Sequence, residues 1–189
     1  MPVFRRLLPA ASAAALAATL LTPVPAPAAA AEIPTVVTSE ESGNGELAEA
    51  TCPEGMGMVG GGYHVYPFAT GFGQVADFIK VNGPSATQHD TWQVQQLHGP
   101  STAYVMCLSS AHSPGVVRTQ RSEPGKVAYA TCPEGTVLSG GGYAADPAVT
   151  GVGHNADEIA TNAPSASVAN TWVARMAYGR VSALAMCTI

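Results

Sequence analysis

Two short stretches decide the fold of this chain, and each is present twice. Ala-Thr-Cys-Pro-Glu-Gly fills residues 50–55 and returns at 130–135, and Gly-Gly-Gly-Tyr fills residues 60–63 and returns at 140–143. In both cases the second copy follows the first by 80 positions. A fixed spacing of this kind identifies an internal repeat, which has to be recognised before any local structure is assigned. The chain is therefore a duplication of one unit.

The repeat also sets the predicted domain organisation. The two copies align without a gap from Val36 and Val116 onward. We expect a first β module at 32–109, a linker at 110–115 and a second β module at 116–189. The linker is polar and contains Pro and Gly, as connecting segments do. Because this linker is short, we expect the two copies to pack together with approximate two-fold symmetry.

The composition of each copy predicts an all-β fold. Short segments rich in Val, Thr, Tyr and Trp alternate with Gly and Pro, which favours strands, and no window shows helical periodicity. In the second copy, strands are expected at 116–118, 126–132, 136–143, 158–162, 171–178 and 181–188. The first copy should carry the same strands 80 positions earlier. About six strands per copy predict two tandem, small antiparallel β-sandwich modules of jelly-roll-like form.

The first 31 residues predict a secretory signal peptide. The basic pair Arg5-Arg6 precedes an uncharged apolar stretch at 7–21, and small residues follow, with cleavage expected after Ala31 or Ala28. No later apolar run approaches the roughly 20 residues that a membrane-spanning helix needs. The sequence therefore predicts a secreted, extracellular protein without a membrane span.

The charge of the remaining chain limits its partners. Removal of residues 1–31 leaves six Lys and Arg against 13 Asp and Glu, a net charge of −7. Such an acidic chain neutralises few phosphates, which excludes nucleic acid and makes anionic membrane surfaces poor partners. An extracellular protein or glycan is the expected partner, and the oligomeric state stays open.

The four cysteines predict disulfides, because the chain is expected to be exported. Four cysteines allow three connectivities. Pairing Cys52 with Cys107 and Cys132 with Cys187 closes each copy identically, across 55 residues in each case. Pairing between the copies also respects a two-fold axis and stays open. A zinc site is not predicted, because no Cys-x-x-Cys spacing is present.

The order of the motifs resembles known secreted modules. Ala-Thr-Cys-Pro-Glu-Gly, a Val/Leu-x-Gly-Gly-Gly segment and a closing Ala-x-Ala-Met-Cys are similar to the β-sandwich modules of resistin and to the Cys/His-rich C-terminal region of a secreted proprotein convertase. They also resemble uncharacterised actinobacterial-type secreted proteins. The resemblance covers 36–109 and 116–189, and it implies a six-stranded jelly roll, a first-to-last disulfide and non-catalytic protein binding. This chain has only two cysteines per copy, so no surface or partner is carried over.

The candidate ligand-binding residues are polar and aromatic residues that both copies share. They are Asp77, Asn82, Asp157, Asn162, Tyr63 and Tyr143. An exposed aromatic ring beside Asp or Asn suits sugar or peptide binding. The same residue types also have structural uses, because Asp and Asn satisfy loop backbone groups and Tyr fills cores. Both interpretations are carried forward.

No catalytic set, cofactor or metal site is predicted. The glycine triplets lack the Lys-Ser/Thr of a phosphate loop, and within strands they indicate a bulge or a close backbone approach. The leading hypothesis is a secreted, non-catalytic binding or interaction protein that recognises an extracellular macromolecule or glycan. Two alternatives stay open: an inhibitor of extracellular enzymes, and a hydrolase whose site lies in the first module. The hydrolase residues would be His64, His89, His98 and Asp90.

Overall fold

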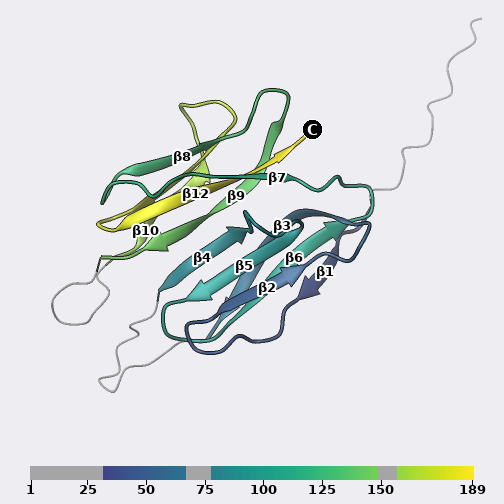
Figure 1. Ribbon diagram of the computed structural model, residues 1–189, viewed down its shortest axis with the longest axis horizontal. Helices are drawn as coiled ribbons and strands as arrows, with labels where there is room; N and C mark the ends of the chain where they lie inside the picture. Colours follow the sequence, from purple (N-terminus) through teal and green to yellow (C-terminus); the bar gives the residue numbers. More distant parts are fainter. Residues whose placement is uncertain (1–31, 67–77, 149–156) are drawn as a thin grey trace, which may run out of the picture. The chain divides into compact units, whose positions relative to one another are not determined.

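The computed structural model describes residues 32–66, 78–148 and 157–189, and these residues form strands and no helix (Figure 1). The prediction of an antiparallel all-β protein is confirmed. The strands of the first copy are β1 (Thr35–Thr38), β2 (Leu47–Thr51), β3 (Gly57–Val65), β4 (Ile79–Pro84), β5 (Thr91–Gln96) and β6 (Ser101–Leu108). Those of the second are β7 (Gly115–Arg118), β8 (Val127–Thr131), β9 (Val137–Asp146), β10 (Ile159–Pro164), β11 (Thr171–Met176) and β12 (Arg180–Thr188).

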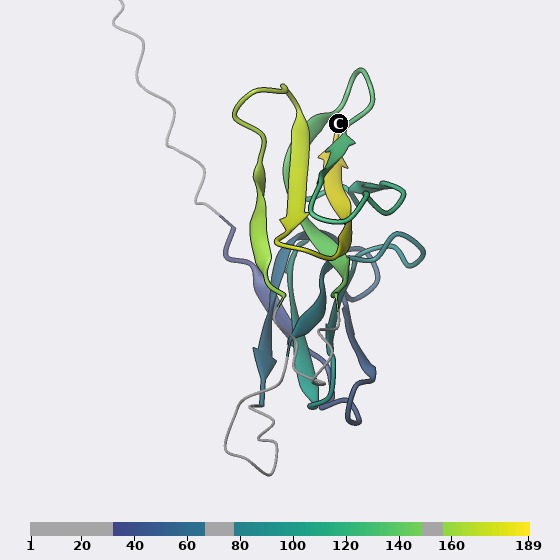
Figure 2. The same ribbon diagram turned by 90° about the vertical axis from the view of Figure 1, so that its left-hand side faces the viewer.

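The strands of the two copies divide in the same way. In the first copy, β1-β6-β3 form one set of neighbours and β2-β5-β4 form the other. In the second copy the equivalent sets are β7-β12-β9 and β8-β11-β10. The turned view in Figure 2 shows the two layers of the second copy, with β10 and β11 on one side and β9 and β12 on the other. The duplicated sequence therefore forms strands with the same neighbours in both copies.

One strand pair joins the copies. β4 pairs with β9, with Val81 opposite Ala144 and Asn82 opposite Tyr143, so β2-β5-β4-β9-β12-β7 is one six-stranded sheet. A two-fold axis would also pair β10 with β3. Among the described strands, β3 and β10 instead lie at the ends of two separate three-stranded sheets. The expectation of symmetric packing is therefore wrong at this second junction.

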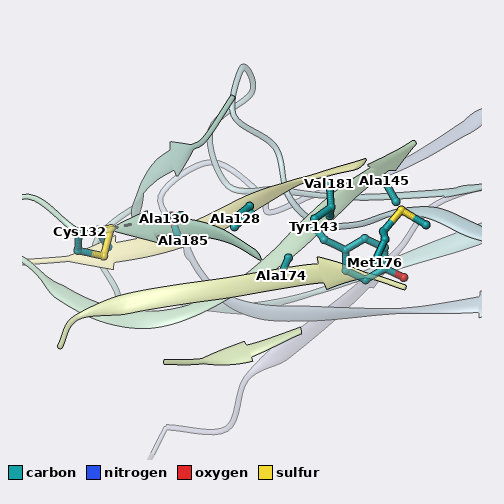
Figure 3. Close-up of a cluster of buried hydrophobic side chains, with 11 residues drawn as sticks. Ala128, Ala130, Cys132, Tyr143, Ala145, Ala174, Met176, Val181 and Ala185 are labelled. Atoms are coloured by element: carbon teal, nitrogen blue, oxygen red, sulfur yellow. Dashed lines mark hydrogen bonds between the residues drawn. A yellow bond between two sulfur atoms is a disulfide. The ribbon is translucent and has the colours of Figure 1, made fainter. Parts of the chain in front are cut away.

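Each copy has its own core. In the second copy, Figure 3 shows the side chains of Tyr143 and Met176 at the end of the cluster remote from the disulfide at Cys132. In β12, residues 181–187 are all buried, since this strand lies between β9 and β7 and has covered faces on both sides. This agrees with its sequence, which is apolar from 181 to 187 apart from the buried Ser182.

The disulfides form within the copies. Cys52 bonds to Cys107 and Cys132 bonds to Cys187, with Cα–Cα distances of 5.7 and 5.6 Å. Each bridge connects the end of the second strand of its copy to the last strand, which belongs to the other sheet. The within-copy pairing is confirmed, and no cysteine is free in the described chain.

The Cys-Pro-Glu-Gly segments are tight turns between the two layers. The amide of Met56 donates to the carbonyl of Pro53 at 3.1 Å, and Thr136 donates to Pro133 at the same distance. The glycine inside each turn has a φ of 83°. A positive φ at the third turn position favours Gly, because a Cβ would be strained there.

The glycine triplets let a tryptophan lie against the backbone. A Cβ on Gly61 would overlap the indole ring of Trp92, and one on Gly141 would overlap that of Trp172. The strand register also shifts immediately before each triplet, which marks a bulge. The predictions of a bulge and of a close backbone approach are both confirmed.

Candidate binding site

Asn82 and Asn162 hold the two tryptophans in place. The indole Nε1 of Trp92 donates to Oδ1 of Asn82 at 3.0 Å, and that of Trp172 donates to Oδ1 of Asn162 at 2.8 Å. Each asparagine lies on the strand next to its tryptophan. Partly buried polar groups need partners of this kind. The structure therefore gives each amide oxygen an internal role, and ligand contact by these asparagines stays a prediction.

Asp157 organises the loops around β10. Its carboxylate accepts hydrogen bonds from the backbone amides of Ala148 and Tyr178, each at 2.9 Å, and from that of Glu158 at 3.0 Å. The residue is buried. These bonds match the loop-satisfying role of Asp that the sequence allowed. Its repeat counterpart, Asp77, lies outside the described residues, and ligand contact by either aspartate stays a prediction.

The two repeat tyrosines lie in different environments. Tyr143 is 6% exposed within the second core, and this burial raises the pKa of its phenol. Tyr63 is 45% exposed. Phe78 and Ile79 of the first copy pack against the core cluster that contains Tyr143. Residues at the start of the β4 segment thus help to bury the core around Tyr143, whereas the equivalent tyrosine of the first copy, Tyr63, remains exposed.

The glycines that precede these tyrosines show the same difference. At Gly142 a Cβ would overlap the carbonyl oxygen of Asn82 and the Cα of Gly83, because β4 lies against this point. At Gly62 a Cβ would meet no atom of the residues that the structure describes within 4 Å. We call Gly62, Tyr63 and His64 the open β3 edge. It is the uncovered equivalent of the β9 edge that binds β4.

Apolar and aromatic groups adjoin the open β3 edge. Met106 lies opposite Gly60 on the neighbouring strand and is 38% exposed, whereas its counterpart Met186 is 1% exposed and belongs to the core cluster of the first copy. The ring of His64 contacts that of Tyr66 edge-on, with the ring centroids 4.7 Å apart. Exposed apolar groups at an unpaired strand edge are features of recognition sites.

A polar contact involves Tyr66, which follows β3 directly. A hydrogen bond from Tyr66 to Glu41 raises the pKa of the tyrosine. In the second copy the same two repeat positions hold Asp146 and Arg121, which form an ion pair. The contact is therefore kept in both copies with different chemistry.

The second copy has a counterpart of β4, the strand β10, but among the described strands β10 does not pair with the other copy as β4 does. The segment that precedes and forms β4 runs Phe-Ile-Lys-Val-Asn-Gly-Pro at 78–84, and its counterpart at 158–164 runs Glu-Ile-Ala-Thr-Asn-Ala-Pro. Glu158 replaces the Phe78 that covers the neighbouring core, and Ala163 replaces Gly83. A Cβ at Gly83 would lie 2.9 Å from the Cα of Gly142, which is too close. These differences explain why β10 does not form the pairing that β4 forms.

The residues of the hydrolase hypothesis lie apart. His89 precedes β5 and His98 follows it, so the six residues of the strand, about 20 Å in length, separate them. The carboxylate of Asp90 accepts hydrogen bonds from the amide of Met58, at 2.9 Å, and from the hydroxyl of Ser113. A serine–histidine–aspartate relay instead requires the histidine between the other two groups. The structure does not assemble these residues into one site.

A hollow lies beside Asp90, next to the linker between the copies. Its volume is about 470 Å³, and its lining includes Glu54, His89, Asp90 and His112. Within the described ranges, no three His, Cys, Asp or Glu side chains form a group that could hold a metal ion. In the same part of the chain, no helix is long and apolar enough to cross a membrane.

The open β3 edge was not predicted as a site, although Tyr63 was a candidate ligand-binding residue and His64 belonged to the hydrolase alternative. The sequence feature that indicates this edge is a difference between the two copies, not a residue that they share. Comparison of 78–84 with 158–164 reveals that one copy carries a junction strand and the other does not. Which edge this leaves open requires the strand order, which the sequence does not give.

Comparison of this chain with protein-family models, with curated proteins and with solved structures found no match.

Proposed function

We propose that this chain is a secreted, non-catalytic interaction protein that binds an extracellular polypeptide at the open β3 edge. It consists of two jelly-roll-like modules, each with one disulfide. The strand orders 1-6-3 and 2-5-4, repeated as 7-12-9 and 8-11-10, support this division into modules. The disulfides support an oxidising, extracellular location, because thiols are kept reduced in the cytosol.

One observation carries the proposal: β4 covers the edge of β9, whereas no strand of the described residues covers the equivalent edge of β3. An unpaired edge presents a row of backbone donors and acceptors that another extended chain can satisfy. In strand addition, main-chain hydrogen bonds supply affinity, and side-chain contacts supply specificity. Tyr63 provides such a side-chain contact, because nearly half of its surface is exposed.

The edge favours a polypeptide over a glycan. A glycan offers no ladder of alternating N–H and C=O groups to pair with a strand edge. Sugar sites instead use aromatic rings beside polar side chains, and the oxygens of Asn82 and Asn162 already bond to tryptophans. The net charge of −7 that remains without residues 1–31 favours a partner that is neutral or basic.

A peptide library displayed on phage tests the proposal, with the secreted protein and its Gly62→Val variant as parallel baits. A Cβ at Gly62 meets no atom of the described residues within 4 Å, so we expect the fold to be kept, whereas the valine would block any strand that approaches as β4 approaches Gly142. We expect peptides that the natural protein retains and the variant loses. Retention by both proteins, or binding on a glycan array without peptide binding, would contradict the proposal.

A histidine variant tests the hydrolase alternative with the same protein. His89→Ala removes the imidazole beside the hollow near Asp90 and leaves β3 untouched. We expect unchanged peptide retention and no hydrolysis of generic peptide, ester or glycoside substrates by either protein. A hydrolytic activity that disappears with His89→Ala would favour an enzyme.

A further inference from the structure

We infer that the open β3 edge accepts a strand with the chemistry of β4: a large apolar side chain at the position of Phe78 and glycine at that of Gly83. This inference rests on the proposed function and specifies its partner. The protein contains its own example of the complex, because β9 and β3 derive from the same repeat position and β9 has β4 bound to it.

The glycine requirement follows from the observed junction. Where β4 crosses β9, Gly83 faces Gly142, and a Cβ on Gly83 would lie 2.9 Å from the Cα of Gly142 and 3.3 Å from the amide nitrogen of Tyr143. The β3 edge repeats this order as Gly62 followed by Tyr63. A strand that docks in the same register needs glycine opposite Gly62 for the same steric reason.

The apolar requirement follows from the exposed surface. Phe78 and Ile79 pack against the core that contains Tyr143. At the open β3 edge the corresponding tyrosine is 45% exposed, so an aromatic or aliphatic side chain at the Phe78 position would bury part of its ring. Burial of apolar area stabilises the complex by roughly 25 cal/mol for each Å² removed from water.

A second copy of this chain is a poor source of such a strand. Its β4 is already paired with β9, and β10 carries Glu158 and Ala163 in place of Phe78 and Gly83. Docking of β10 would place a carboxylate against the exposed Tyr63 and a methyl group against Gly62. Glu158 and Ala163 therefore disfavour docking of β10 of one molecule onto β3 of the next. Two identical repeats without these differences would favour such head-to-tail chains. The partner is therefore an extended segment of a different polypeptide.

A synthetic peptide of residues 78–84 (Phe-Ile-Lys-Val-Asn-Gly-Pro) provides the probe, with the peptide of residues 158–164 as the matched control. Amide shifts of the isotope-labelled, disulfide-bonded protein are followed by NMR during titration. We expect saturable shifts at Gly62, Tyr63 and His64. Binding should weaken at least tenfold when Gly83 of the peptide is Ala or Phe78 is Glu, and the 158–164 peptide should bind at least tenfold more weakly.

The Gly62→Val protein separates this site from the β9 edge. We expect the variant to lose binding of the 78–84 peptide at least tenfold while its thermal midpoint stays unchanged. Shifts at Gly142 and Tyr143, or equal binding by the variant, would place the peptide at β9 and overturn the inference. A concentration-dependent dimer that Gly62→Val abolishes would also overturn it, because the occupant would then be a second copy.

Failure of the inference differs from failure of the proposed function. If the phage library yields peptides that depend on Gly62 but lack the apolar and glycine positions, the proposed function stands and this inference falls. If no peptide depends on Gly62, both fall.

Discussion

Gly61 and Gly62 are adjacent in the sequence, but they have opposite requirements for space. The backbone at Gly61 lies against the Trp92 indole, whereas a Cβ at Gly62 would meet nothing within 4 Å. The same contrast is absent from the second copy, where both Gly141 and Gly142 are in close contact. The change in stability caused by a substitution at each glycine of the triplets therefore shows how closely that position is packed.

Gly61→Ala and Gly141→Ala should each lower the free energy of unfolding by about 1–3 kcal/mol, the usual cost of overpacking a core. The added methyl would overlap the indole ring, which the disulfide-closed core cannot easily move. Denaturant midpoints measure the effect. Gly62→Ala is the control and should be neutral or slightly stabilising; a loss there equal to that of Gly61→Ala would show that the space around Gly62 is filled.

Asn162→Ala should lower the free energy of unfolding by about 1–2 kcal/mol, because the partly buried indole N–H of Trp172 would lose its acceptor. Asn162→Asp retains an oxygen at the same position and should recover part of this loss. Urea unfolding gives the stability, and tryptophan fluorescence reports on the ring. Equal losses in the two variants would mean that the hydrogen bond is not the cause.

At the level of elements, Glu32 attaches the segment before β1 to the end of β6. Its carboxylate accepts bonds from the amide and hydroxyl of Ser109, at 2.8 and 2.5 Å, and from the amide of Ser110 at 3.2 Å. These bonds lower the pKa of Glu32 from 4.5 to about 2. A depressed folded-state pKa stabilises the attachment above pH 4.5, and this stabilisation is lost as the pH falls toward 2.

Amide exchange at Ser109 and Ser110 should therefore accelerate between pH 4.5 and 2 beyond the intrinsic pH dependence of exchange. Glu32→Gln removes the charge and should show the faster exchange at every pH, with no additional change across this window. Exchange that follows the intrinsic rate in the natural protein at all pH values would show that the carboxylate does not hold this segment.

The β4–β9 junction depends on backbone contact, so Gly142→Val should disrupt it. The valine would overlap Asn82 and Gly83. We expect loss of amide-exchange protection at Asn82 and Tyr143 and greater exposure of Phe78, while both disulfide-closed cores persist. Gly62→Val is the matched control, since it changes the equivalent position in the first copy. Intact protection in Gly142→Val would contradict the close approach.

For the whole molecule, the shared six-stranded sheet couples the two copies. Residues 32–189 form one compact unit, and Met186 of the second copy belongs to the core of the first. Replacing Cys132 and Cys187 together with Ala should lower the free energy of unfolding by roughly 4 kcal/mol, the chain-entropy value for a loop of this length. Calorimetry should show a single transition at a lower temperature. Two transitions, with the first copy unaffected, would show that the copies unfold independently.

Features set by neighbouring residues could be predicted from the sequence, whereas contacts between distant residues could not. The strand at 181–188 and the turns at 53–56 and 133–136 were predictable because hydrophobic runs and Cys-Pro-Glu-Gly act locally. The bonds from Asn162 to Trp172 and from Asp157 to loop amides were not predictable, because they join residues that only strand pairing brings together. For the same reason, a list of polar residues shared by both copies did not identify the open β3 edge.

The sequence by itself determined that the chain repeats one β-rich unit of about six strands, with equivalent cysteines in each copy. These properties follow from periodicity, composition and spacing, which are written along the chain. Only the tertiary structure decided that β4 rather than β10 forms the junction, and that β3 keeps an open edge. The physical reason is steric: the two strands pair only where their backbones can approach closely because a Cβ is missing. That contact joins residues far apart in the sequence, such as Gly83 and Gly142, which are 59 positions apart.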